Sequence, residues 1–503
     1  MPSPLLKPGR AAVSTSIQTL AAAILISLLG ACAVGPDYIR PALPQADTFA
    51  RQHATQDALP QPADIPFWRS FDDPLLERLV DSALNHNHDL RIALANYQQA
   101  NALLGERRFD RFPTLTASAE ATRLHASEAG PSPSGASYQL GLGAVWELDF
   151  FGRVRRSVEA QRAQAQASAA DLSAMQVSVV GELARSYFQL RSLQQQRHIS
   201  QESARSQART QELLQQRHDM GFASAFDVDR GRTQLESIHA RIPALDAEVA
   251  VTTHRIAVLT GATPAALAQE LDVAGKLPVM PVLGVAPDSP GEVLRRRPDV
   301  AAAERRLASA TARIGVATAD LFPRFTLGGL IGAQALEVSS LFQRDNDIRM
   351  LTLGIDGSFL NVGRVRSRIA AADAQAAAHL AAYERAVLVA LEETENALIR
   401  VSASAREVER LQRAAAASAR AMDAAQVRLE GGAIDVLDVL DAERIHLQTE
   451  HAYAQGQLRH AQARVLLYQA LAGGWSVAVT EDPDDGSVTT DQGSAMRDRS
   501  QAA

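Results

Sequence analysis

Residues 431–444 read Gly-Gly-Ala-Ile-Asp-Val-Leu-Asp-Val-Leu-Asp-Ala-Glu-Arg, and they interrupt a sequence that is otherwise helical from about residue 363 to 471. The paired glycines can adopt the positive φ that ends one helix, and the apolar residues after them start the next. Asp435, Asp438 and Asp441 recur every three residues, so Asp438 and Asp441 share one face of a helix. The stretch therefore predicts a narrow helical hairpin with an acidic tip.

Two interpretations of this tip fit the local sequence equally well. The acids can line the mouth of a channel. They can also be solvated side chains at an exposed turn between coiled-coil helices, where acids are favoured near a helix N-terminus. The rest of the chain has to decide between the two.

The composition excludes several classes of protein. The chain has 503 residues and a formal net charge of -7, so nothing suggests a nucleic-acid partner. Aromatic residues make up only 5%, which is low for a compact globular core. No catalytic constellation, metal-ligand cluster or phosphate-binding glycine loop is apparent, so we expect neither an enzyme nor a metal or cofactor site.

The single cysteine, Cys32, ends a Leu-Gly-Ala-Cys sequence that matches the bacterial lipoprotein cleavage box. Lys7 and Arg10 form a positive n-region, and the apolar run 20–29 is too short to span a bilayer comfortably. We therefore expect cleavage before Cys32, with a diacylglycerol and a palmitoyl chain on the new N-terminus. Ala33 stands where an Asp would favour retention in the inner membrane, so an outer-membrane location is expected.

Two segments alternate apolar and polar residues with a period of two, as β-strands do. In 113–150 an apolar row begins at Leu115 and returns from Tyr138 to Phe150, and 324–360 holds a second such hairpin. Strands of about ten residues with one apolar face suit a transmembrane barrel, with a soluble antiparallel hairpin as the alternative. Because no later segment is apolar enough for a transmembrane helix, any membrane span has to be β.

Helical periodicity returns after each hairpin. We expect one helix from about 151 to 220, roughly 100 Å long at about 1.5 Å per residue, and a second from about 226 to 259 that Pro243 kinks. A shorter helical region before the first hairpin breaks at 85–88, a polar loop that we expect Asp89 to cap.

The two halves of the chain repeat one another, and this is the strongest signal in the sequence. The matching pairs are Phe112-Pro113 with Phe322-Pro323 (322 − 112 = 210), Gly152-Arg153 with Gly363-Arg364 (363 − 152 = 211), Gly221 with Gly432, and Asp227-Val228 with Asp438-Val439. Each half supplies one β-hairpin and one long helical hairpin. Four strands cannot close a barrel, and open edges are not tolerated in lipid, so the chain has to oligomerise.

These signals divide the chain into six segments. They are 1–31, the lipoprotein signal peptide; 32–66, an extended arm; 67–262, the first repeat; 263–290, a Pro-rich linker; 291–475, the second repeat; and 476–503, a polar, disordered tail.

Five motifs are distinctive in combination. They are Cys32-Ala33-Val34-Gly35-Pro36-Asp37-Tyr38, Phe67-Trp68 followed by Asp73-Pro74-Leu75, Phe150-Phe151-Gly152-Arg153, Arg296-Arg297-Pro298-Asp299, and the tip ending Val439-Leu440-Asp441-Ala442. With these motifs the chain resembles the TolC-like outer-membrane efflux factors, in the lipoprotein branch typified by OprM and NodT. The resemblance covers nearly all of the mature chain.

The resemblance implies a mixed α and β fold in a homotrimer. Three sets of four strands would form one outer-membrane β-barrel, continued by a long periplasmic α-helical barrel, with the linker and tail in an equatorial belt. It implies a passive exit duct for small molecules, seated in the lipid of a Gram-negative outer membrane. The implied partners are a periplasmic membrane-fusion adaptor and an inner-membrane pump of the RND type, whose docking opens the closed helical end like an iris.

The resemblance also assigns roles to residues at the tips. Leu437, Asp438 and Asp441 match positions that line the periplasmic constriction, and Asp227 matches a first-half residue that helps hold the closed state. Three copies of Asp438 and Asp441 would place six carboxylates in a narrow ring, which predicts cation selectivity and block by multivalent cations.

One departure from the family pattern concerns how the tip closes. Some relatives have an Arg and a Tyr there that form closing polar links. This chain has Ile434 and Leu429 at those positions. We therefore expect apolar packing, rather than those polar links, to hold its closed state.

Four arginines follow the hairpins where strand becomes helix: Arg153, Arg155, Arg364 and Arg366. The resemblance places them at the periplasmic membrane interface, where they can bind lipid headgroups. The alternative is that they are solvated charges at helix starts.

Two other functions remain open. The same duct can serve protein export, as in type I secretion, since nothing in the expected pore lining names a cargo. A non-conducting coiled-coil adhesin or structural lipoprotein would also present long helices, but it has no need for paired β-hairpins at matching points of a repeat.

Overall fold

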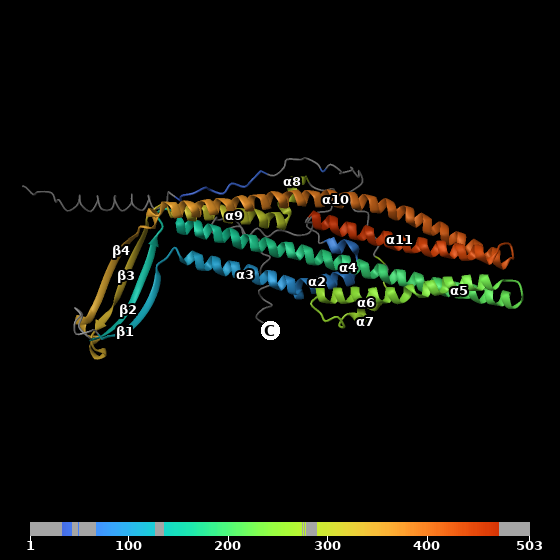
Figure 1. Ribbon diagram of the computed structural model, residues 1–503, viewed down its shortest axis with the longest axis horizontal. Coiled ribbons are helices and arrows are strands. Elements are labelled where there is room, and N and C mark those ends of the chain that lie inside the picture. Colours follow the sequence, from blue (N-terminus) through green and yellow to red (C-terminus); the bar gives the residue numbers. More distant parts are fainter. Residues whose placement is uncertain are drawn as a thin grey trace, which may run out of the picture.

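The computed structural model describes residues 33–42, 49, 67–125, 135–273, 275, 277 and 289–471. The molecule is long and narrow, with a four-stranded sheet at one end and helices along the rest (Figure 1). The expectations for the signal peptide, for Cys32 and for the C-terminal tail fall outside the described residues. None of the helices in these ranges is long and apolar enough to cross a membrane.

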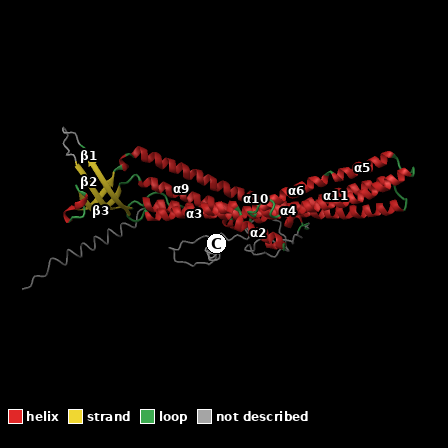
Figure 2. Ribbon diagram, turned by 90° about the horizontal axis from the view of Figure 1, so that it is seen from below, coloured by secondary structure: helices red, strands yellow, loops and turns green. Residues whose placement is uncertain are grey.

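The strands are confined to one end of the molecule (Figure 2) and pair in chain order, all antiparallel. They are β1 (Thr114–Leu124), β2 (Gly135–Leu148), β3 (Arg324–Ala335) and β4 (Asp347–Asp356). The two predicted hairpins are thus joined side by side through β2 and β3. β1 and β4 form the two outer edges of the sheet.

The strand register places the apolar rows of both hairpins on one face. Trp146 pairs with Leu327, which in turn pairs with Leu353. On the same face, two residues further along each strand, Ala144 pairs with Gly329. Several large side chains on this face are exposed in the single chain; Leu353, for example, is 64% exposed. A contiguous apolar face that spans four strands requires either lipid or another chain against it.

The helices follow the same order in each half of the chain. The first half holds α2 (Pro74–His86), α3 (His88–Phe109), α4 (Arg153–Asp219), α5 (Ala225–His239) and α6 (Arg241–Leu259); the second holds α8 (Pro290–Arg296), α9 (Pro298–Ala319), α10 (Val362–Glu430) and α11 (Val436–Ala470). The linker contains a short helix, α7 (Ala268–Asp272), that the sequence analysis did not predict. Four short 3-10 helices complete the described elements, at Phe67–Phe71, Val338–Ser340, Arg344–Asn346 and Ser358–Leu360.

The predicted break between α2 and α3 occurs at Asn87, but the predicted cap is wrong. The Asn87 side chain, not Asp89, accepts the backbone N–H of Leu90 at 3.1 Å. Its amide also donates to the carbonyl of Leu259 at 2.9 Å, which ties this corner to the end of α6. Asn87 is buried, whereas Asp89 is exposed in the first turn of α3. Asn is among the residues most favoured at the N-cap of a helix.

Pro243 breaks its helix rather than merely kinking it. α5 ends at His239 and α6 begins at Arg241. Proline lacks an N–H and its ring clashes with the carbonyl four residues earlier, which is that of His239. The equivalent position in the second half is Ala454 (243 + 211 = 454), and there α11 runs unbroken.

The largest core lies midway along the helices, where α2, α4, α6 and α11 meet. Phe67 and Phe71 of the first 3-10 helix pack there; the Phe71 ring lies 4.9 Å from that of Phe188 on α4. Tyr187 donates its hydroxyl to Asp73 at 2.5 Å, and Asp73 caps α2. The Phe67-Trp68 and Asp73-Pro74 motifs therefore fasten α2 to the long helices.

The described part of the arm, residues 33–42, lies along the helices from the sheet end toward the middle. Val34 donates its N–H to the carbonyl of Phe151 at 3.2 Å, next to the start of α4. Further on, the hydroxyl of Tyr38 donates to Glu304 of α9. At Gly35, φ is +92° and an added Cβ would lie 2.4 Å from the Cα of Gly315, so this close crossing requires glycine.

Candidate functional site

Two helical hairpin tips lie together at the end of the molecule opposite the sheet (Figure 1). The first joins α4 to α5 and the second joins α10 to α11. Gly221 (φ +81°) and Gly432 (φ +70°) provide the left-handed residue that ends the incoming helix of each tip. Ser224 and Asp435, also 211 residues apart, are the N-caps of the outgoing helices.

The first tip is closed by a reciprocal capping box. The N–H of Asp227 donates to the Ser224 hydroxyl at 3.2 Å, and the N–H of Ser224 donates to the Asp227 carboxylate at 3.1 Å. The Ser224 hydroxyl also donates to that carboxylate at 2.6 Å, and this bond is the main cause that lowers the pKa of Asp227. The contacts recorded for the Asp227 side chain are therefore local to its own tip.

The second tip carries the predicted acidic pair on the first turns of α11. Asp435 caps the helix by accepting the N–H of Val436 at 2.6 Å. Asp438 and Asp441 lie three residues apart on α11, on one face of the helix as their spacing predicts, and both are exposed. Asp441 forms an ion pair with Arg444 at 2.5 Å, and both of these side chains remain half exposed. Asp438 has no ion-pair or side-chain hydrogen-bond partner among the described residues, so it carries the less compensated charge.

A small apolar cluster holds the second tip against α4, and we call it the tip cluster. It consists of Leu214, Leu429, Val436, Val439 and Leu440. Leu440 is 1% exposed, so its side chain is fully enclosed. Ile434 and Leu437 are partly buried against the cluster. Leu429 and Ile434 thus take part in apolar packing at this tip.

A hydrogen bond joins the outgoing helices of the two tips. The side-chain amide of Gln234 on α5 donates to the carbonyl of Leu440 on α11 at 3.1 Å. Asp227 lies on the first tip and the acidic pair lies on the second. No hydrogen bond or ion pair between described residues joins them. Within one chain, then, the structure brings together Leu437, Asp438 and Asp441 but leaves Asp227 apart.

The sequence analysis missed a buried carboxyl group next to the tip, Glu443. It is 8% exposed and accepts hydrogen bonds from Ser206 at 2.8 Å and Thr210 at 3.3 Å, both on α4. Its Oε2 has no hydrogen-bond partner in the described part of the chain. Burial raises the pKa of Glu443, and the hydrogen bonds offset this only in part. The sequence did contain a signal for this burial, because residues 436, 440, 443 and 447 are spaced so that they lie on one buried face of a helix.

Changing Glu443 to Gln is expected to stabilise the protein at neutral pH. Because the folded pKa is raised, the folded chain binds more protons than the unfolded chain between the two pKa values, so wild-type stability falls as pH rises through that window. The variant should therefore melt above the wild type at about pH 8, and the gain should vanish near pH 4, the ordinary Glu value. Thermal unfolding followed by circular dichroism measures this; Glu450→Gln on the same helix, where the side chain is less buried, is the control. An equal gain at every pH contradicts the explanation.

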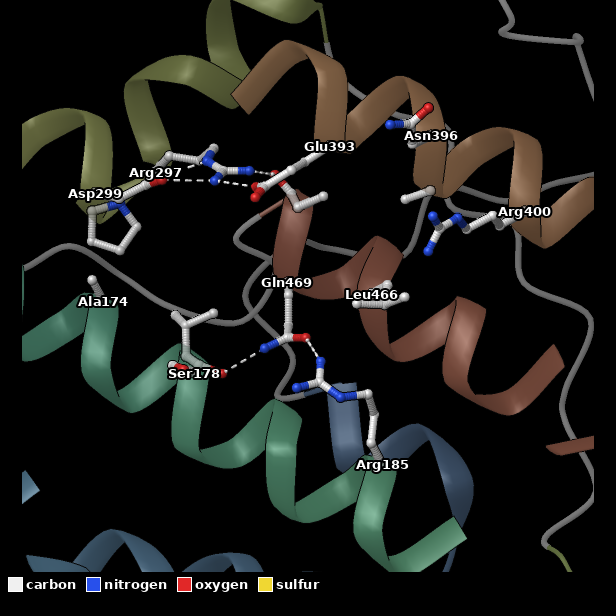
Figure 3. A pocket seen from close by; sticks show the side chains of 14 residues that line it. Ala174, Ser178, Arg185, Arg297, Asp299, Glu393, Asn396, Arg400, Leu466 and Gln469 are labelled. Carbon is white, nitrogen blue, oxygen red and sulfur yellow. Dashed lines mark hydrogen bonds and ion pairs between the residues drawn. The ribbon is translucent and has the colours of Figure 1, made fainter. Parts of the chain in front are cut away.

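A second candidate region is a cavity of about 490 Å³ midway along the helices (Figure 3). Arg297, at the start of α9, pairs with Asp299 at 2.7 Å and with Glu393 of α10 at 2.6 Å. Across the cavity, Gln469 of α11 accepts from Arg185 of α4 at 2.6 Å. The Arg-Arg-Pro-Asp motif thus joins α9 to α10, which is a structural role.

The four arginines where strand becomes helix fall into two pairs. Arg153 donates to Glu147 at 2.7 Å, and Arg155 forms an ion pair with Asp149 at 3.3 Å. Arg364 and Arg366 are exposed at the start of α10, and neither guanidinium has a hydrogen-bond or ion-pair partner among the described residues. Only the second pair is free to take an external anion.

The family model described as "Outer membrane efflux protein" matches residues 79–262 and 289–473. Outer membrane protein OprJ of Pseudomonas aeruginosa is 34% identical over 470 residues, which cover 90% of this chain and 95% of OprJ. The solvent efflux pump outer membrane protein SrpC of Pseudomonas putida is 30% identical over 466 residues, covering 90% and 97%. The solved outer-membrane channel OprN superposes with a TM-score of 0.81 at 38% identity, covering 88% of this chain and 100% of that one.

The chain belongs to the outer membrane efflux protein family. The two matched ranges correspond to the two halves of the internal repeat. The family resemblance, the mixed fold of four strands continued by long helices, and the outer-membrane location in efflux are confirmed. The acidic tip therefore belongs to an outer-membrane efflux protein, and the adhesin interpretation is not needed.

Proposed function

We propose that three copies of this chain form one passive duct, through which a partner pump expels small molecules across the outer membrane. The observation that carries the proposal is the four-stranded sheet, with an exposed apolar face and two edges, β1 and β4, that have no partner strand in the described chain. Lipid does not tolerate such edges. Pairing β4 of each copy with β1 of the next closes a twelve-stranded barrel, and the long helices continue it.

At the far end of this duct, the second tips form the gate. Three copies of Asp438 and Asp441 supply six carboxylates, which attract cations and repel anions. The tip cluster holds each α11 in place beside α4. No reacting group is required, because the energy for export comes from the pump.

The partners are proposed from the resemblance to the efflux family. A duct that ends in a closed gate needs a protein that opens it and a pump that feeds it, and we propose a periplasmic membrane-fusion adaptor and an inner-membrane pump of the RND type. The name of SrpC assigns that relative to a solvent efflux pump, which supports small apolar molecules as cargo. A lipid anchor on Cys32 fits the arm, since Ala33 lies against Gly152 where β2 gives way to α4.

Native mass spectrometry of the full-length protein, extracted from outer membranes in mild detergent, tests the assembly. We expect the mass of a trimer whose chains each begin at Cys32 and carry the diacylglycerol and palmitoyl groups. The Cys32→Ser variant should lose the acyl mass and keep the trimer, because the helices and strands do not depend on the anchor. A stable monomer or dimer contradicts the proposed duct, and an unmodified N-terminus contradicts the anchor.

A further inference from the structure

Exposed, unpaired arginines occur at two places next to the sheet. Arg364 and Arg366 lie at the start of α10, directly after β4, and Arg108 and Arg111 lie at the end of α3, directly before β1. None of the four guanidinium groups has an ion-pair or hydrogen-bond partner within the described ranges.

Several of the acids around them are already engaged. Asp110 pairs with Arg107 at 3.2 Å, and Asp320 accepts from Arg368 at 3.2 Å and also from Arg324. Glu147 and Asp149 pair with the arginines at the start of α4. These acids are therefore not available to offset the charge of the four unpaired arginines.

The two places meet when the sheet edges pair between subunits. All neighbouring strands in the sheet are antiparallel. If β4 of one copy pairs in the same way with β1 of the next, Asp356 at the end of β4 lies near Thr114 at the start of β1. At about 1.5 Å per helical residue, Arg364 and Arg366 lie within about one turn of the start of α10. In this pairing they come beside Arg108 and Arg111 of the next copy.

The four arginines lie where the sheet meets the helices, which is also the edge of the apolar surface. Phe109 and Phe112, which flank Arg111, are 74% and 62% exposed. The indole N–H of Trp146 donates to the carbonyl of Arg111 at 3.0 Å, and tryptophan is favoured at the boundary between hydrocarbon and headgroups. Ala33, the first described residue of the arm, contacts Gly152 at this same junction of strand and helix.

We propose that each boundary between subunits binds the phosphate of an anionic phospholipid, held by Arg364 and Arg366 of one copy and Arg108 and Arg111 of the next. The proposal rests on the trimer proposed above. Four like charges brought together at one boundary repel one another, and a phosphodiester removes that repulsion while accepting charge-assisted hydrogen bonds. The exposed phenylalanines beside the arginines suit acyl chains, which favours a membrane lipid over free phosphate. The lipid thus cross-links neighbouring subunits where the barrel meets the helices.

Native mass spectrometry of the delipidated trimer, titrated with phosphatidylglycerol, measures the site. We expect up to three tightly bound lipids per trimer, with at least about tenfold higher affinity than for phosphatidylcholine of the same acyl chains. Inorganic phosphate at millimolar concentration should not displace them. Arg364→Gln with Arg366→Gln should weaken phosphatidylglycerol binding by about tenfold or more. The control, Arg406→Gln with Arg410→Gln, removes two exposed arginines further along α10 and should leave it unchanged.

A second variant tests whether both subunits contribute. Arg108→Gln with Arg111→Gln should weaken binding of the same lipids, up to three per trimer, that the α10 pair holds, and combining the two pairs should weaken it further. If instead each pair of substitutions removes its own set of lipids and leaves the affinity of the other set unchanged, the two pairs bind separate lipids, which contradicts the composite site. A trimer that binds phosphatidylglycerol no better than phosphatidylcholine, or releases it to inorganic phosphate, overturns the lipid site and leaves the duct intact. A chain that stays monomeric in the same spectra overturns both.

Discussion

Changing both Asp438 and Asp441 to Asn is expected to abolish the cation selectivity of the channel and to weaken its block by trivalent cations by about tenfold or more. A unit charge about 4 Å from another gains about 1 kcal/mol in water, so a trivalent ion gains about 3 kcal/mol from a single carboxylate. Screening by salt reduces this, but about 1.4 kcal/mol already corresponds to tenfold in affinity. Reversal potentials and titrated block in planar bilayers measure both effects.

The two acids are not expected to contribute equally. Arg444 already offsets the charge of Asp441 at 2.5 Å, whereas Asp438 has no such partner in the described structure. Asp438→Asn alone should therefore remove more selectivity than Asp441→Asn alone. Asp229→Asn with Asp423→Asn, two exposed acids on α5 and α10, is the matched control and should change little. Unaltered selectivity in the Asp438 and Asp441 double variant rules out the acidic ring.

Leu440→Ala is expected to raise the open probability of the channel by at least about tenfold. Truncation of a fully buried leucine costs about 2–5 kcal/mol, and Leu440 is 1% exposed in the tip cluster. This packing holds α11 to α4 in the present arrangement, so its loss favours arrangements in which the tip has moved apart. The expected result is frequent, larger conductance steps in planar bilayers and, in cells, increased entry of large antibiotics.

A matched change elsewhere separates gating from general loss of stability. Leu183 is fully buried in the core midway along the helices, so Leu183→Ala should lower the melting temperature by a similar amount. Because that core is remote from the tips, the conductance of this variant should stay at the wild-type level. Equal leak in the two variants means that the tip cluster does not hold the gate.

Much of the fold was predictable because its local signals agree with one another. The alternation of apolar and polar residues located the strands. Gly221 and Gly432 located the two tips, because glycine is the residue that most readily adopts the left-handed conformation between two helices. The structure revised details that depend on tertiary contacts. Asn87 caps α3 because it also reaches Leu259, a contact that no local pattern reveals. Pro243 divides its helix, which follows directly from its missing N–H and the clash with His239.

The candidate site was predictable only in part. The shared helical face of Asp438 and Asp441 follows from their spacing, but the ion pair that distinguishes Asp441 depends on the rotamer of Arg444. Glu443 was missed because acidic residues are usually exposed, although it lies on the buried face of α11. The four arginines after the hairpins looked equivalent in sequence. Only the structure shows that Glu147 and Asp149 engage Arg153 and Arg155 and leave the α10 pair free.

The central claim is that this chain forms a trimeric duct closed by an acidic gate. Planar-bilayer conductance of the purified, lipidated trimer, with and without a trivalent cation, tests it most directly. We predict small, cation-selective currents that the trivalent cation blocks. If the wild type is silent because its gate is tightly closed, the Leu440→Ala variant should conduct, because the tip cluster holds the gate. Silence from both folded trimers would contradict the account and favour a structural lipoprotein.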